Sequence, residues 1–543
     1  MKIIYSFIIF QKTSEKHSKM AVIFESLLLY AGVIAVCTLT AIYFYFKRSW
    51  TYWKKRNVPY LEPTFPFGNF SDIVLQRKSI GEVFKKLYDQ LDGNKYAGTY
   101  MFTKAEFLFR DPEIIKNVLV KDFSNFHDRG FYINEEREPL TGHLFLLPGT
   151  KWRNLRVKLT PTFTSGKMKM MFQTLVDCGQ ELGECLTETA NNEEVIEIKD
   201  VVARFSTDII SSCAFGIQCN CLKNPDAEFR QWGRKIFEPT INNSLFSLLS
   251  FTVPALVDFL KIRPLDKKVT KYFRNMVEET VNYRERNSFK RNDFIQLLIQ
   301  IKNKGTVDAD CKNGHQNGHT ISEKISDDNT MSMNCLAAQA FVFFIAGFET
   351  SSTTMQFCLY ELTKNPDIQD RVRQEIDEIL KKHDGKITYE AVQEMEYLDK
   401  VVSETLRKYP PVPILNRECT KTYHIPGTDV VLNEGDLTVI PVLGLHHDPK
   451  YYPNPEKFDP ERFSEEEKAK RHHYAYLPFG EGPRICIGMR FGLMQTKVGL
   501  ISLLSRYQFC VSKETPIPLV MEPKSVVLSP MGGMHLQIKK RVK

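Results

Sequence analysis

The segment Phe479-Gly-Glu-Gly-Pro-Arg-Ile-Cys-Ile-Gly488 combines the residue types that could hold a flat ligand around a metal ion. Cys486 directly precedes an apolar stretch that we expect to be helical from about Ile487, and a helix N-terminus stabilises a thiolate. Arg484 supplies a cation for an anionic ligand group. A haem meets both demands, with an iron for the thiolate and carboxylates for the arginine. Three glycines, Gly480, Gly482 and Gly488, let the backbone approach such a ligand closely. The alternative is a glycine-rich turn with a buried cysteine.

A second chemical segment is Ala346-Gly-Phe-Glu-Thr350, which hydroxyl residues follow at 351–354. A glycine costs about 1 kcal/mol against alanine inside a helix, and hydroxyl side chains compete for its backbone hydrogen bonds. We therefore expect a local kink that opens a groove beside Glu349 and Thr350. The alternative is a helix that tolerates these residues without any chemical role.

Glu404 and Arg407 are three residues apart on a helix that should end before Pro410, so they share one face. Such a pair, taken alone, is usually a surface ion pair.

In combination, these motifs make the chain resemble the cytochrome P-450 superfamily, over nearly its whole length after residue 70. Residues 479–488 match the FxxGxRxCxG signature, and residues 346–350 resemble the AGxET motif. The resemblance implies a mainly α fold with minor β, with haem b between a long distal helix and the loop of the proximal ligand Cys486. It also implies a monooxygenase that inserts one oxygen atom of O2 into lipophilic substrates, for which Glu349 and Thr350 deliver protons through water.

The same resemblance assigns further roles residue by residue. The ExxR pair is braced by Pro460-Glu-Arg-Phe463, so Glu404, Arg407 and Arg462 are expected to be structural. The haem-contacting set is expected to be Trp152 and Arg156 of a WxxxR motif, Arg417, Phe479, Arg484, Cys486 and Gly488.

Segments 143–169 and 478–492 look most like the microsomal insect group called family six, many members of which oxidise plant toxins and insecticides. An endogenous hormone or fatty acid as substrate, a reductase-independent isomerase and a catalytically silent haem carrier are the alternatives; the acid–alcohol pair argues against the last two. Aromatic residues suit lipophilic ligands, although core packing explains each of them equally well. By position, the expected substrate contacts are Phe126, Phe131, Tyr132, Phe341, Phe344, Ile345, Val412 and Leu415.

Electrons must come from a partner, because the chain has no GxGxxG fingerprint for a nicotinamide. The resemblance points to NADPH–cytochrome P-450 reductase, a flavoprotein, with cytochrome b5 as a second donor. Basic residues that could form the docking face are Lys151, Arg153, Lys158, Lys167, Lys169 and Arg490.

The bulk composition fits a globular protein, with 543 residues, 43% hydrophobic and 25% charged. The net charge of +8 is mild and includes no long basic block, so we expect no nucleic-acid partner. The 12 cysteines are scattered, which indicates a reducing compartment. Substrate identity and oligomeric state are left open by the sequence.

An apolar run from Leu27 to Phe46 has the length of a membrane-spanning helix. Basic and aromatic residues follow it, which favours a single-pass anchor in the endoplasmic reticulum with the body in the cytosol. The sequons at Asn69 and Asn242 should then stay unmodified. We expect a doubtful N-terminal extension at 1–19, the anchor at 20–46, a basic and proline-rich linker at 47–69, and the catalytic domain at 70–543.

Hydrophobic periodicity and breakers place the positioning elements. We expect strands within 99–109, mostly helix over 151–260, an exposed loop at 302–328, and helices over 329–364, 367–382, 398–409 and from about 487.

Overall fold

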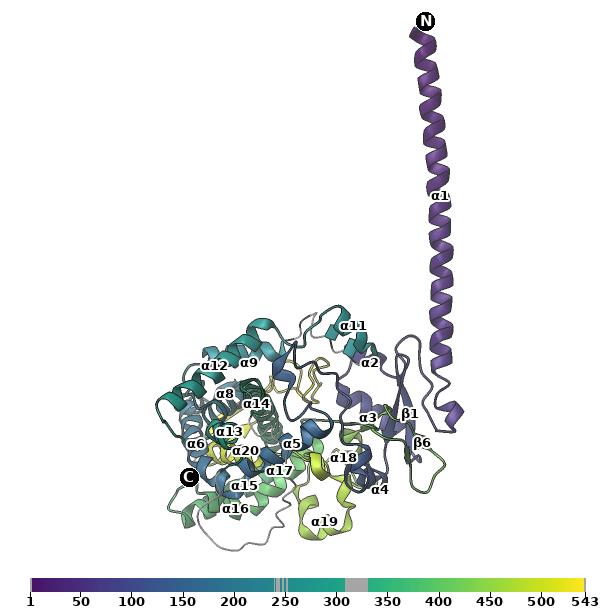
Figure 1. Ribbon diagram of the computed structural model, residues 1–543. Coiled ribbons are helices and arrows are strands. Elements are labelled where there is room, and N and C mark those ends of the chain that lie inside the picture. Colours follow the sequence, from purple (N-terminus) through teal and green to yellow (C-terminus); the bar gives the residue numbers. More distant parts are fainter. Residues whose placement is uncertain are drawn as a thin grey trace.

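The computed structural model describes residues 2–238, 240, 245–246, 249–250, 252–307 and 331–541. A long N-terminal helix, α1 (Lys2–Ser49), projects away from a mainly helical body (Figure 1). The helix over Ile23–Arg56 has a mean hydropathy of 2.2 and none of its most apolar window is buried, so it is a candidate membrane anchor. The other long apolar helix, α14 (Met333–Lys364), is mostly buried and forms the centre of the body.

The residues after α1, in the predicted linker, are docked on the body through Trp50 and Trp53. Trp53 is 0% exposed, its ring lies 5.4 Å from that of Phe107, and its Nε1 donates to Thr99 O (3.1 Å). Trp50 Nε1 donates to Phe102 O at 2.7 Å. Both tryptophans therefore belong to a protein core, and the prediction that they mark the membrane interface is wrong.

The helices of the body are amphipathic or buried elements that end at capping residues or prolines. Those of the first half are α2 (Ser71–Val74), α3 (Ile80–Gln90), α4 (Pro112–Lys116), α5 (Gly149–Leu159), α6 (Ser165–Cys185), α7 (Thr187–Asn191), α8 (Ile198–Ile210), α9 (Glu228–Phe237), α11 (Pro254–Phe259), α12 (Lys267–Arg286) and α13 (Phe294–Lys304). Those after α14 are α15 (Pro366–Lys382), α16 (Tyr389–Glu394), α17 (Glu396–Lys408), α18 (Val442–His446), α19 (Glu465–Lys470) and α20 (Met489–Leu504).

Three small sheets accompany the helices. The largest has the strand order β1-β2-β7-β4, with β1 and β2 antiparallel (Tyr96 opposite Phe109) and β2 and β7 parallel (Glu106 opposite Leu437). The strands are β1 (Tyr96–Met101), β2 (Lys104–Phe109), β3 (Val195–Glu197), β4 (Leu415–Glu418), β5 (Tyr423–His424), β6 (Val431–Leu432), β7 (Leu437–Ile440), β8 (Tyr507–Cys510) and β9 (His535–Lys540).

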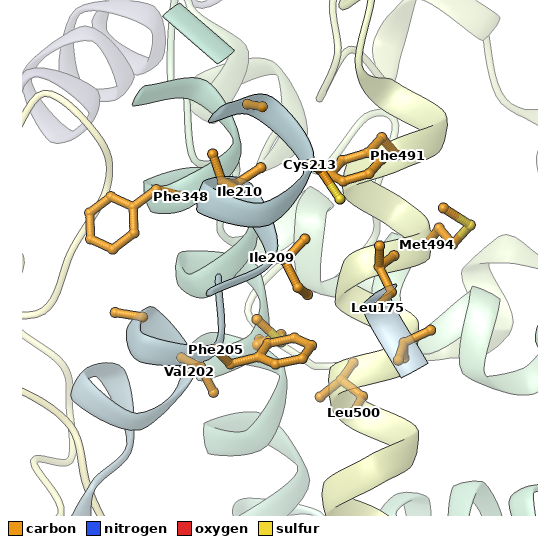
Figure 2. Packing of buried hydrophobic residues seen from close by; sticks show 14 of the residues in the cluster. Leu175, Val202, Phe205, Ile209, Ile210, Cys213, Phe348, Phe491, Met494 and Leu500 are labelled. Atoms are coloured by element: carbon orange, nitrogen blue, oxygen red, sulfur yellow. The ribbon is translucent and has the colours of Figure 1, made fainter. Parts of the chain in front are cut away.

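The core forms where α14 packs against α8 and α20. Phe205 and Ile209 of α8 point toward Leu500 of α20 (Figure 2). Gly499 permits this approach, because a Cβ there would lie 2.8 Å from Phe205 and 2.5 Å from Met355 Sδ. The arrangement makes α14 a fixed wall for the space beside it.

The predicted elements agree well with these bounds. Strands 99–109 and the helices over 367–382 and 398–409 are present within a few residues, and a mainly α fold with minor β is confirmed. The helix expected from residue 329 begins at Met333, and the expected loop 302–328 overlaps the end of α13, while residues 308–328 lie outside the described residues. Helix α14 runs without interruption across Glu349 and Thr350, and the local kink expected there stays a prediction.

Candidate active site

A cavity of about 290 Å³ lies between α14 and the loop that carries Cys486. Its walls come from segments far apart in the sequence. They include Trp152 and Arg156 of α5, Ala346, Gly347, Thr350 and Thr354 of α14, Val412, Leu415 and Arg417 around β4, and Phe479, Arg484, Cys486 and Gly488 of the loop.

The loop around Cys486 is shaped by backbone contacts. Cys486 N donates to Phe479 O at 3.0 Å. Gly482 has a φ of +74°, and a Cβ there would lie 1.9 Å from Leu119 O, so only glycine fits. Helix α20 begins at Met489 rather than at the expected Ile487. The helix N-terminus therefore lies three residues beyond the sulfur and does not cap it directly.

Cys486 lines the cavity and is exposed to it. Burial raises the pKa of this thiol, while the Gly488 N–H and the charges of Arg156 and Arg129 act to lower it. A buried thiolate is stabilised when a metal cation accepts its charge. The position thus suits a metal ligand better than a free nucleophile.

Four arginines converge at one edge of the cavity: Arg129, Arg156, Arg417 and Arg484. Burial lowers the pKa of Arg129 to about 10 and that of Arg484 to about 9, and burial together with the other two guanidinium groups lowers that of Arg417. The nearest carboxylate, Asp128, lies 3.4 Å from Arg484. Several buried cations therefore share one counter-charge.

The chemistry of this edge fits a ligand with two carboxylates. Arg417 Nε, Arg484 Nη1 and Arg129 Nε are buried without a hydrogen-bond partner, although such atoms normally have one. Arg484 is fixed by Leu147 O (2.9 Å) and by the ring of Trp152, whose centroid lies 4.2 Å away. The thiol and the arginine edge together match the iron and the carboxylate side groups of haem.

The distal wall shows which face of α14 meets the cavity. Thr350 lines it, and its hydroxyl donates to Ala346 O at 2.5 Å. Glu349 points away from the cavity and pairs with Lys199 of α8 at 3.1 Å. Gly347 accommodates Ile210, because a Cβ there would lie 2.5 Å from Ile210 Cδ1. The structure thus separates the expected acid–alcohol pair onto two sides of the helix.

Of the expected substrate contacts on α14, none lines the cavity. Phe341 and Phe344 are buried and pack on Phe273 of α12, with ring centroids at 5.3 and 5.5 Å. Ile345 also packs against the hydrophobic core rather than lining the cavity. The cavity-facing positions of the helix are one residue away from these three, at Val342, Phe343 and Ala346.

The expected contacts in the loop before α5 are also displaced. Phe126 is 0% exposed and packs on Tyr423, with ring centroids at 4.9 Å, in a separate core cluster. Tyr132 donates to Asp258 of α11, outside the cavity. Phe131 lies behind Phe145, which does line the cavity. These three residues therefore lie off the cavity wall, whereas Val412 and Leu415 line the cavity.

The ExxR pair lies behind the Cys486 loop. Glu404 and Arg407 are both 0% exposed, with Arg407 Nε donating to Glu404 Oε2 at 2.7 Å and Nη2 to Oε1 at 2.8 Å. Arg462 lies 3.5 Å from the same carboxylate. Arg407 Nη1 donates to His446 O (3.0 Å), and His446 Nε2 accepts from Leu477 N (2.9 Å). Leu477 precedes Phe479 by two residues, so the network reaches the loop.

Two charged residues of the site were missed by the sequence reasoning, Arg129 and Lys199. Arg129 lies between residues singled out as aromatic substrate contacts, and no spacing distinguishes it from a surface arginine. Lys199 starts α8, about 150 positions before Glu349, so its pairing depends on how two helices pack.

Comparisons with known proteins agree with this site. A model of the family described as Cytochrome P450 matches residues 58–536. The chain is 46% identical over 496 residues to "Probable cytochrome P450 6a14" of Drosophila melanogaster, which covers 90% of this chain and 95% of that protein. It is 45% identical to "Cytochrome P450 6k1" of Blattella germanica (94% and 97% covered), and 42% identical to "Cytochrome P450 6A1" of Musca domestica (96% and 100% covered). The chain therefore belongs to the cytochrome P450 family, as a monooxygenase of the insect family-six type.

Proposed function

We propose that this protein is a membrane-anchored monooxygenase for lipophilic xenobiotics such as plant toxins or insecticides, supplied with electrons by NADPH–cytochrome P450 reductase on the cytosolic face of the endoplasmic reticulum. The observation that carries the proposal is the cavity that joins Cys486 to Thr350 and has apolar walls between them. An endogenous hormone or fatty acid of similar polarity remains the competing substrate class.

Haem is held by residues with separate tasks in this proposal. Cys486 Sγ would ligate the iron, and Arg129, Arg156, Arg417 and Arg484 would neutralise the carboxylates, as the unpartnered nitrogens of Arg129, Arg417 and Arg484 suggest. When bound, the haem supplies oxygen activation and transfer of one oxygen atom to the substrate. Glu404, Arg407 and Arg462 take no part in that chemistry and hold the loop.

Proton handling falls to two neighbouring residues of α14. The Thr350 hydroxyl donates to Ala346 O, so its oxygen can accept a hydrogen bond from water in the cavity. Glu349 pairs with Lys199, whose side chain is 28% exposed, and this pair connects the helix with solvent. We propose that Glu349 collects protons on the solvent side and that Thr350 orients the water that carries them. General acid assistance of this type is worth about 10²–10⁴-fold.

Substrate preference follows from the apolar part of the cavity wall. Leu144, Phe145, Val412 and Leu415 offer apolar surface, and the cavity's charges are those of the four arginines at its arginine edge. A neutral, lipophilic molecule loses little on leaving water for such walls, which supports a xenobiotic substrate without naming one.

Electron delivery requires a docking face near Cys486. Arg153 of α5 is exposed and Lys158 is half-buried, on the helix that also carries Arg156. Lys151 and Lys169 already bind Glu135 and Glu390, each at 2.7 Å. Lys167, which was predicted to belong to the docking face, is buried. We therefore assign docking of the acidic reductase surface chiefly to α5, with cytochrome b5 as an alternative donor there.

Reconstitution in vesicles with reductase, NADPH and ¹⁸O2 tests this function against a panel of neutral plant toxins, steroids and fatty acids. One ¹⁸O atom per product from a toxin is expected. No product from any compound with reductase present would overturn the proposal, and product only from fatty acids or steroids would favour the competing class.

Charge reversal separates docking from chemistry. Arg153→Glu with Lys158→Glu should slow reductase-supported turnover about tenfold or more, because docking is electrostatically steered. Peroxide-supported turnover should not change. Lys78→Glu, an exposed lysine before α3, is the matched control. Equal losses in both assays would contradict docking at α5.

A further inference from the structure

Two cysteines outside the active site lie close together on the segment between α8 and α9. Cys219 and Cys221 flank Asn220, which has a left-handed φ of 50°. Residues two apart span at most about 7 Å when fully extended, and a left-handed residue between them shortens that span. The separation therefore falls within the Cα–Cα range of about 4.4–6.8 Å that a disulfide accepts.

The pair is held by backbone contacts to the end of α8. Asp208 of α8 anchors the second cysteine, since its Oδ1 accepts from Cys221 N at 2.6 Å and its Oδ2 accepts from Leu222 N at 3.0 Å. The two thiols, one residue apart, also shift each other's pKa.

The two thiols differ in access and acidity. Cys219 is half-buried, so a small molecule can reach it, whereas Cys221 is 0% exposed. The hydrogen bond from Cys221 lowers the pKa of Cys219, and the same bond, with burial and Asp208, raises the pKa of Cys221. A thiolate is the form that attacks an oxidant, so Cys219 is suited to react first and Cys221 second.

We propose that Cys219 and Cys221 form a site of reversible oxidation by hydrogen peroxide, which converts the dithiol to an intramolecular disulfide. The Cys219 thiolate attacks one peroxide oxygen, the O–O bond breaks, and the departing hydroxide takes up a proton to become water. The resulting sulfenic acid is attacked by Cys221 sulfur, an S–S bond forms, and a second water leaves with the Cys221 proton. Both thiols are oxidised by one peroxide, and a thiol reductant restores them.

The location gives the oxidation a local consequence. The segment follows the π-helical turn Ser211–Phe215, whose Cys213 and Ala214 line the active-site cavity. Asp208, which anchors Cys221, belongs to the end of α8. The proposal itself requires only the dithiol and peroxide, so it stands or falls separately from the monooxygenase function.

Mass spectrometry of the full-length, haem-loaded protein tests the site. The protein is treated with one to a few equivalents of hydrogen peroxide, alkylated, and digested with trypsin. Cys213, Cys219 and Cys221 share the tryptic peptide 205–223, so fragmentation reads all three at once. We expect this peptide to lose two hydrogens, with Cys219 and Cys221 protected from alkylation, Cys213 alkylated, and full reversal by dithiothreitol.

Variants separate the two roles. Cys221→Ser should accumulate a Cys219 sulfenic acid that dimedone traps, and Cys219→Ser should leave Cys221 unoxidised. Cys178→Ser, a half-buried cysteine of α6, is the matched control and should behave as the parent. Full alkylation of Cys219 and Cys221 in the treated parent protein would overturn the proposal, as would oxidation of Cys221 in the Cys219→Ser protein at the parent's level.

Discussion

Removing both members of the buried Glu404–Arg407 pair should destabilise the protein no more than removing the worse single member. Both side chains are 0% exposed, and Arg407 makes further bonds to His446 O (3.0 Å) and Pro455 O (2.8 Å). In Arg407→Met the Glu404 carboxylate keeps Asp459 N (2.9 Å) as its nearest donor. Breaking a buried pair by removing one partner costs about 3–5 kcal/mol.

The double variant Glu404→Met/Arg407→Met removes both charges. It leaves His446 O, Pro455 O and Asp459 N without these partners, as the single variants do between them, but it buries no unpaired charge. The double variant should therefore cost no more than the worse single variant, which gives a coupling energy of about 3 kcal/mol or more in the cycle.

Urea unfolding followed by circular dichroism, with a fixed excess of haem, measures each free energy of unfolding. Lys400→Met is the control on the same helix, since Lys400 pairs with Glu461 at 2.9 Å with side chains 24% and 46% exposed. An exposed pair of this kind is worth at most about 1 kcal/mol. A coupling energy below about 0.5 kcal/mol would refute the view that this pair braces the loop.

Three other outcomes follow from single sites. Thr350→Ala should still bind haem and substrate but should release peroxide in place of product. Ser352→Ala is the control and should stay coupled, because the Ser352 hydroxyl lies away from the cavity and donates to Phe348 O at 2.9 Å. The ratio of product formed to NADPH consumed measures the coupling. Burial raises the pKa of Glu106 to about 7 from 4.5, so the stability of the folded protein falls as pH rises from about 4.5 through 7. Glu106→Gln should therefore be more stable than the parent by about 3 kcal/mol at pH 8. Urea titrations at pH 5 and 8 test this, and an equal free energy of unfolding for the two proteins at pH 8 would contradict it. Asn69 should carry no glycan in protein from insect cells, because the body is proposed to face the cytosol and the side chain donates to Leu61 O and accepts from Tyr100 N (2.8 Å). A glycosidase-sensitive shift in mass would contradict the cytosolic orientation.

The motifs with fixed local spacing were the predictable part of the site. Cys486, Arg484 and Gly488 are separated by a few residues, so the sequence alone brings them to one loop. Val412 and Leu415 were found for the same reason, since they follow the end of α17 directly.

The phase of α14 could not be predicted. This helix is buried on nearly all sides, so its hydrophobic pattern does not show which side faces a cavity. As a result Phe344 was expected in the cavity, whereas Phe343 is there, and Glu349 was placed with Thr350 although Lys199 holds it on the other side.

Loop residues were unpredictable for a different reason. The positions of Phe126, Arg129 and Tyr132 depend on long-range partners, namely the Tyr423 ring, the arginine edge and Asp258. Local propensity contains no information about such contacts. The docking of Trp53 on β1 and β2 was missed in the same way, because an aromatic residue beside a membrane helix suits the interface and a core equally.

Carbon monoxide difference spectra of the reduced protein test the central claim, that Cys486 binds haem iron as a thiolate. The parent should show the band at about 450 nm that thiolate-ligated haem gives, and Cys486→Ser should lose it. Cys510→Ser, another partly exposed cysteine, should retain it. A Cys486→Ser protein that keeps the parent's band would contradict the assignment.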